Sequence, residues 1–93
     1  MLNIHVFYRA ESGEDLRKFY EEAKAAGVIE KSRQDEGCLQ YDYFFSADRD
    51  NEILLLEKWE SKELQQKHGQ QPHFAELGKL KEKYKIQSEL EFL

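Results

Sequence analysis

The nine residues EILLLEKWE, at positions 52–60, decide which fold the chain can form. Side chains of a β-strand point alternately to the two faces of a sheet. Ile53, Leu55 and Trp59 are therefore expected on one face, and the other face carries Leu54 and Leu56. A sheet with one wet face would show strict alternation of apolar and polar residues. This stretch instead predicts a strand that is covered on both faces.

Three further strands are predicted around this one. They lie at residues 2–10 (LNIHVFYRA), 38–47 (CLQYDYFFSA) and 85–92 (KIQSELEF). Each alternates apolar residues with period two, which is the pattern of a strand. The acidic turn at residues 48–51 is short enough to join its two neighbours as an antiparallel hairpin.

Two helical regions separate the strands. The first begins near residue 14, breaks at Gly27 and ends before Gly37. In the second, Ser61 caps a short helix, and another starts at Pro72, whose missing N–H costs nothing at that position. The resulting order is β-α-β-β-α-β. With right-handed crossovers both helical regions cover the same face of the sheet, so the expected architecture is a ferredoxin-like α+β fold.

The face of the sheet away from the helices is predicted to meet a second copy of the chain. Leu54 and Leu56 lie on the opposite face of their strand from the other apolar residues, and alternation places Leu39 and Tyr41 on one face of the strand before it and Phe44 on the other, so the face without helices is also apolar. If left wet, these apolar side chains would form a larger patch than soluble monomers usually carry. A twofold partner, sheet against sheet, covers them, and we expect a homodimer.

Composition limits the class of protein. Ninety-three residues suffice for one domain, residues 1–93, and a chain this short gains stability from association. The net charge of −5 leaves no basic patch for nucleic acid. No apolar stretch reaches the length of a membrane span, and the N-terminus lacks the pattern of a signal peptide. The single cysteine, Cys38, is expected to be a buried thiol, and the predicted location is the cytoplasm.

Two groups of residues are candidates for chemistry. Glu57 shares a strand face with Trp59, and a carboxyl group buried on an apolar face has a raised pKa that suits proton transfer. His68 and His73 flank a break in the helical pattern, so both can reach one cleft as general bases. The alternatives are a Glu paired at the sheet edge and two histidines with structural roles. Metal binding is a weaker alternative for the two histidines, because no third ligand is evident and the spacing is not that of a helical zinc pair.

Three stretches stand out when they are taken together. They are residues 35–41 (DEGCLQY), 57–64 (EKWESKEL) and 68–74 (HGQQPHF). In this order and spacing they resemble the antibiotic-biosynthesis monooxygenase domain family, including its quinol monooxygenases. The resemblance covers nearly the whole chain. It implies a dimeric α+β barrel with a pocket between the sheet and the helices of each subunit.

The resemblance also implies an activity and its residues. Similar members oxidise phenols or quinols with O₂ and use no flavin, haem or metal. The catalytic residues implied are His68, His73 and Glu57, and those implied to contact the small aromatic or quinol-like substrate are Trp59, Tyr41, Phe74 and Arg9. A histidine would take the phenolic proton, and the anion would then give an electron to O₂. For Arg9, pairing with a carboxylate is the alternative.

Two other functions stay open at this stage. An isomerase branch of the family, which acts on a phosphorylated autoinducer, shares the His-x-x-x-Pro-His pattern. Arg9 and Arg33 are the candidates to bind its substrate phosphate. The haem-degrading relatives fit less well, because Gly78 stands near the place of their histidine. The second function that stays open is that of a dimer that binds a small ligand without catalysis.

Overall fold

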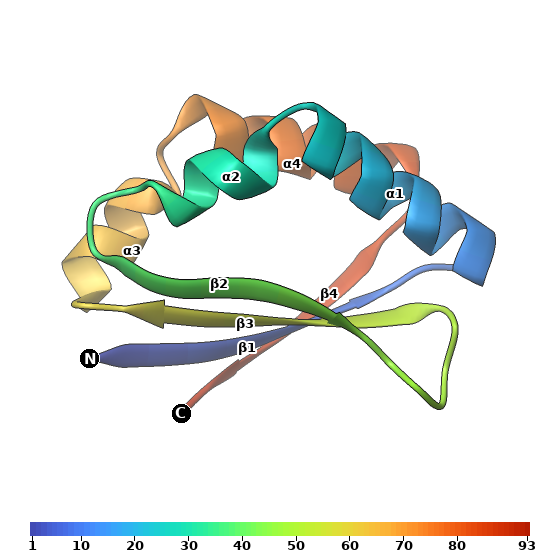
Figure 1. Cartoon of the computed structure of the whole chain (residues 1–93), viewed down its shortest axis with the longest axis horizontal. Coiled ribbons are helices and arrows are strands. Elements are labelled where there is room, and N and C mark those ends of the chain that lie inside the picture. The colour runs from blue at the N-terminus through green and yellow to red at the C-terminus, as the bar shows by residue number, and fades with distance from the viewer.

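Four antiparallel strands form one sheet, and the helices lie on one side of it (Figure 1). The computed structural model describes residues 1–93. Its elements are β1 (Leu2–Arg9), α1 (Gly13–Ala25), α2 (Val28–Arg33), β2 (Cys38–Phe45), β3 (Glu52–Trp59), α3 (Lys62–His68), α4 (Pro72–Lys83) and β4 (Gln87–Phe92). The strand order is β2-β3-β1-β4. The predicted ferredoxin-like α+β fold, with helices on one face, is confirmed.

The helix boundaries follow from side chains that the sequence already identifies. The Ser12 hydroxyl accepts the backbone N–H of Asp15 at 3.1 Å, and the Ser61 hydroxyl accepts that of Leu64 at 3.2 Å. Both serines thereby satisfy a donor that the first turn of a helix leaves free. Gly27 has a φ of 77°, a conformation that favours glycine, and it separates α1 from α2. The predicted break at Gly27 is therefore confirmed.

The hydrophobic core fills the space between the sheet and the helices. Trp59, Ile53 and Leu55 of β3 are fully buried, and so are Leu16 and Phe19 of α1. Burial of each such side chain stabilises the fold by about 1.5–3 kcal/mol. The core thus holds β3 centrally and fixes the direction of every side chain on its helix-facing side. No helix is both long enough and apolar enough to cross a membrane.

One sequence prediction for β2 is wrong. Leu39 does not share the helix-facing side with Tyr41 but is 50% exposed. Cys38 lies opposite Trp59, and Gln40 lies opposite the residue before Trp59, so Leu39 is the extra residue of a β-bulge. Simple alternation fails across such a bulge, because two residues on one strand face a single residue on the other. Beyond it, Tyr41 is buried as predicted.

The face of the sheet away from the helices has an apolar centre, as the sequence predicts. Phe7 and Phe44 both pair with Leu54, so these three side chains lie in a row across β1, β3 and β2. Leu56 lies two residues further along the same face of β3. Phe44 is 49% exposed, and the other three are partly exposed. In a single chain this apolar face is in contact with water.

Candidate active site

Five of the seven residues proposed from the sequence gather around the side chain of a sixth, His68. The five are Tyr41, Glu57, Trp59, His73 and Phe74. The His68 ring centre lies 4.8 Å from that of Trp59, 5.3 Å from that of Phe74 and 5.8 Å from that of Tyr41. The cluster therefore joins the helix-facing side of the sheet to the connection between α3 and α4.

Local structure explains why these side chains converge. Tyr41 of β2 pairs with Glu57 of β3, so the two share the face that the helices cover. His68 is the last residue of α3, and His73 is the second residue of α4, directly after Pro72 at the helix start. The short turn between these helices brings both imidazoles to the same place above the sheet.

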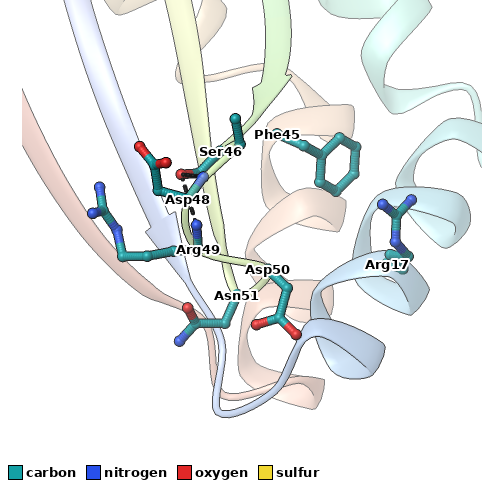
Figure 2. A pocket seen from close by; sticks show the side chains of 8 residues that line it. Arg17, Phe45, Ser46, Asp48, Arg49, Asp50 and Asn51 are labelled. Carbon is teal, nitrogen blue, oxygen red and sulfur yellow. Dashed lines mark hydrogen bonds between the residues drawn. The ribbon is translucent and has the colours of Figure 1, made fainter.

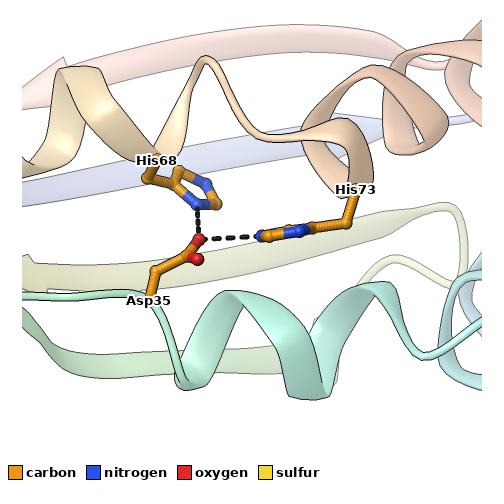
Figure 3. A group of neighbouring side chains, drawn as sticks. All are labelled: Asp35, His68 and His73. Carbon is orange, nitrogen blue, oxygen red and sulfur yellow. Dashed lines mark hydrogen bonds and ion pairs between the residues drawn. The ribbon is translucent and has the colours of Figure 1, made fainter.

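Asp35 is the member of the cluster that the sequence did not single out. One of its oxygens, Oδ2, contacts His68 Nδ1 at 2.6 Å and His73 Nε2 at 2.8 Å (Figure 3). Asp35 lies between α2 and β2, which is 33 and 38 positions away from the two histidines. Local periodicity carries no signal for such distant contacts. The only signal was its place in the first of the three characteristic stretches.

The Asp35 contacts determine which imidazole nitrogens carry hydrogen. An ionised carboxylate only accepts hydrogen bonds, so His68 Nδ1 and His73 Nε2 must be the donors. In the neutral rings the remaining nitrogens, His68 Nε2 and His73 Nδ1, then hold lone pairs. Each histidine is thus oriented by a carboxylate and keeps a basic nitrogen. Asp35, His68 and His73 also place three possible metal-ligand atoms within 4.8 Å of one another.

Burial alters the acid–base properties of the residues beneath His68. Burial raises the pKa of Glu57 above its ordinary value, and the hydrogen bond from the Trp59 indole N–H, at 2.9 Å, offsets this in part. The raised pKa that the sequence predicted for Glu57 is therefore found. Burial and the nearby negative charge of Glu57 also raise the pKa of Tyr41, so its phenol stays protonated at neutral pH.

The cluster is closely packed in the single chain. Trp59 is fully buried, and His68, His73 and Glu57 are at most 8% exposed. Of the larger surface hollows, one is lined by Tyr41, and none is lined by these four residues. Phe74, which is 41% exposed, is the member of the cluster most open to solvent.

A larger hollow lies at the β2–β3 hairpin, at the opposite end of β3 from Trp59 (Figure 2). The Ser46 hydroxyl accepts two backbone N–H groups there, which fixes the turn. The side chains of Asp48 and Asp50 balance those of Arg17 and Arg49, so the lining has no excess charge of either sign. None of the residues proposed from the sequence lines this hollow.

Arg9 lies apart from the His68 cluster. Its guanidinium donates to Glu52 at 2.9 Å and to Glu89 at 2.9 Å. Arg9 pairs with Glu52 across β1 and β3 on the face of the sheet away from the helices. Glu57 and Trp59 occupy the opposite face, so the carboxylate pairing that the sequence left as an alternative is the one observed.

The fold and this cluster place the chain in a known class of protein. The sequence profile of the antibiotic biosynthesis monooxygenase family matches residues 1–79, and the chain belongs to that family. It is 33% identical over 52 residues to the Bacillus subtilis protein named "Putative monooxygenase YcnE". That match covers 56% of this chain and about half of the relative, 55%.

Solved structures show the same fold. A Bacteroides thetaiotaomicron protein named as a possible oxidoreductase superposes with a TM-score of 0.86 at 27% identity, over 99% of this chain and 94% of its own. SnoaB, a cofactor-independent oxygenase from Streptomyces nogalater, superposes with a TM-score of 0.76 at 12% identity, over 99% and 89%. At that identity SnoaB shows similarity of fold alone.

Proposed function

We propose that the protein is a monooxygenase that oxidises an electron-rich phenol or quinol with O₂ and without flavin, haem or metal. The observation that carries this proposal is the bond between Asp35 and His68. It orients the imidazole, leaves Nε2 free as a base and stabilises the imidazolium that forms when a proton is taken. The rings of Trp59, Tyr41 and Phe74 beside His68 offer flat apolar surfaces to an aromatic substrate.

The reaction balances without a further reductant. His68 Nε2 accepts the phenolic proton, and the resulting anion is electron-rich enough to give an electron to O₂. One oxygen atom then bonds to a ring carbon that carried hydrogen, and the other leaves as water. The phenol thereby becomes a quinone, and it supplies all four electrons that O₂ takes up. The apolar surroundings exclude water from the reactive anion.

Substrate access in this proposal depends on Phe74. Its ring stands edge-on to His68, and it is the most exposed member of the cluster. Phe74 lies on α4 just after the turn that contains Gly69, so a small rotation of this turn would uncover the imidazole. We expect Phe74→Ala to lower the KM for bulky quinols, and an unchanged KM would remove this role for Phe74.

Oxygen consumption with a panel of phenols and quinols tests the proposed activity. We expect His68→Gln to lower kcat/KM by about 100-fold or more, the usual contribution of a general base. His5→Gln is the matched control, because His5 contacts Glu91 and lies on the far face of the sheet. Incorporation of one ¹⁸O atom from ¹⁸O₂ into the product identifies a monooxygenase. Equal rates for wild type and His68→Gln would refute the role of His68.

The close packing of the cluster favours a second candidate function, that of a dimer without catalysis in which Asp35 holds α3 and α4 in place. In that case no quinol is oxidised, and substitution of His68 lowers stability alone. An isomerase would behave differently again. It would exchange substrate hydrogen with deuterated water and consume no oxygen, so the same set of assays separates all three functions.

The homodimer is the second part of the proposal. The apolar row formed by Phe7, Leu54 and Phe44 lies at the centre of the open sheet face, and the charged pairs between β1 and β4 lie at one side of it. A second copy of the same face would cover this row. Leu54→Asp should convert a dimer into a monomer in sedimentation analysis. Lys79→Asp should not, because Lys79 is an exposed residue of α4. A wild-type monomer would contradict the proposal.

The reduced thiol expected of Cys38 supports a cytoplasmic location.

A further inference from the structure

We propose that Asp35, His68 and His73 form a binding site for a divalent transition-metal ion such as Zn²⁺. We further propose that the bound ion removes the free basic nitrogen of each histidine. The donor set is the first argument. Two imidazole nitrogens and one carboxylate oxygen are the ligands of many three-residue zinc sites and of the two-histidine, one-carboxylate sites of other divalent metals. The sequence alone showed only two of these ligands.

The geometry supplies the second argument. His68 Nδ1 and His73 Nε2 both point at the same oxygen, Asp35 Oδ2, at 2.6 and 2.8 Å (Figure 3). An ion about 2.0–2.1 Å from each ligand needs the ligand atoms roughly 3.0–3.4 Å apart. The Asp35 carboxylate therefore has to withdraw by about 0.5 Å from each nitrogen, and the two nitrogens, which lie within 4.8 Å of each other, have to approach to about 3.4 Å. Its other oxygen accepts no hydrogen bond from the chain, so that oxygen is also free to coordinate.

Burial and packing limit the motion of the three ligands. The side chains of His68 and His73 are 2% and 9% exposed, and that of Asp35 is 15% exposed. Trp59 and Phe74 pack against the His68 ring and limit its rotation. Fixed orientation of the ligands raises metal affinity, because less freedom is lost on binding. The partial exposure of Asp35 leaves a path for the ion and for a bound water.

Metal binding has a chemical consequence for each imidazole. A neutral histidine that coordinates through one nitrogen carries its hydrogen on the other. Coordination through His68 Nδ1 therefore moves the hydrogen to Nε2, and coordination through His73 Nε2 moves it to Nδ1. Both lone pairs that face away from Asp35 in the metal-free protein are lost. In the proposed oxygenase the ion would thus act as an inhibitor that removes the general base.

Calorimetric titration of the chelator-treated full chain with ZnCl₂ tests the site. We expect one ion per chain with micromolar or tighter affinity, and a weakening of more than about 100-fold in Asp35→Asn, His68→Gln and His73→Gln. His5→Gln removes the remaining histidine of the chain and should leave the affinity unchanged. Absence of saturable binding, or binding that survives Asp35→Asn and His73→Gln, would overturn the inference.

A second measurement uses the wild-type protein and does not depend on the folding of variants. Nitrogen NMR of the imidazoles should show hydrogen on His68 Nδ1 and His73 Nε2 before Zn²⁺ is added, and on the opposite nitrogens afterwards. His5 should not change. Unchanged tautomers in both rings at saturating Zn²⁺ would contradict coordination by this triad.

The metal inference and the proposed oxygenase can fail separately. Zn²⁺ binding and the tautomer change are measured without substrate, so they stand even if no phenol is oxidised. If oxygen uptake is found but Zn²⁺ neither binds nor inhibits, the metal site is refuted and the oxygenase proposal is unaffected.

Discussion

Replacement of Asp35 by asparagine removes one charge and alters little else, so it isolates what the carboxylate does. The Oδ2 atom of Asp35 accepts N–H groups from both His68 and His73. Both bonds end on the same oxygen, and the amide oxygen of asparagine also has two acceptor lone pairs, so its NH₂ group can take the place of the oxygen that bonds to neither histidine. Asp35→Asn can therefore keep both contacts, but the acceptor is no longer charged.

The size of the effect can be worked from these two contacts. A hydrogen bond to a charged partner stabilises a protein by about 1.5–3 kcal/mol and one between neutral groups by about 0.5–1.5 kcal/mol, so each of the two bonds loses about 1–1.5 kcal/mol. Because the Asp35 side chain is 15% exposed, water compensates part of the loss. We therefore expect the free energy of unfolding to fall by about 2 kcal/mol. For a chain of this length that corresponds to a drop in Tm of about 8–16 °C.

Thermal unfolding followed by circular dichroism at neutral pH measures this drop. Glu36→Gln is the matched control, since it makes the same change in charge at the next residue. Glu36 pairs with Lys67 at 2.8 Å, but both side chains are more than half exposed, and such surface pairs contribute about 0–1 kcal/mol. Equal losses in Tm for Asp35→Asn and Glu36→Gln would refute the view that Asp35 anchors the two histidines.

Four further predictions follow from other positions. Gly37→Ala puts a β-carbon at a φ of 82° and into the side chain of Leu64, so urea denaturation should show a loss of more than about 1–2 kcal/mol. Gly78→Ala meets open space within α4, and the same assay should show a gain of about 0.5–1 kcal/mol. Burial raises the pKa of the Cys38 thiol to about 11. Iodoacetamide at pH 8 should therefore react with Cys38 roughly 200-fold more slowly than with free cysteine, and equal rates would contradict this. The raised pKa of Glu57 means that its contribution to stability is complete below its unfolded pKa and is lost as pH rises through its folded pKa. Glu57→Gln should therefore gain in Tm relative to wild type as the pH rises above the ordinary pKa of glutamate, about 4.3, and a constant difference would contradict it.

Most of the fold could be predicted because its signals are local. Ser12 and Ser61 mark helix starts through bonds to residues three positions away, and Gly27 marks the break between α1 and α2 through its own backbone conformation. The two-sided apolar pattern of β3 likewise needs no knowledge of distant residues. Leu39 was misplaced because a bulge depends on the register with β3, which a single strand does not reveal.

The candidate site was predictable only in part. Glu57 and Trp59 lie two residues apart on one strand, and His68 and His73 flank one turn, so each pair could be recognised within its own segment. Asp35 belongs to the site only through contacts made by the folded chain. A carboxylate that follows a helix also occurs on ordinary solvated surfaces, so its residue type was no guide.

The bulge in β2 makes this strand tolerant of a change in length at one position. Because Leu39 is the extra residue, its deletion would restore strict alternation and keep Cys38 and Tyr41 on the buried face. Deletion of Asp42 would instead turn every later residue of β2 to the opposite face, with Tyr43 leaving the helix side. We therefore expect natural one-residue deletions in β2 to be found at position 39 and not beyond it.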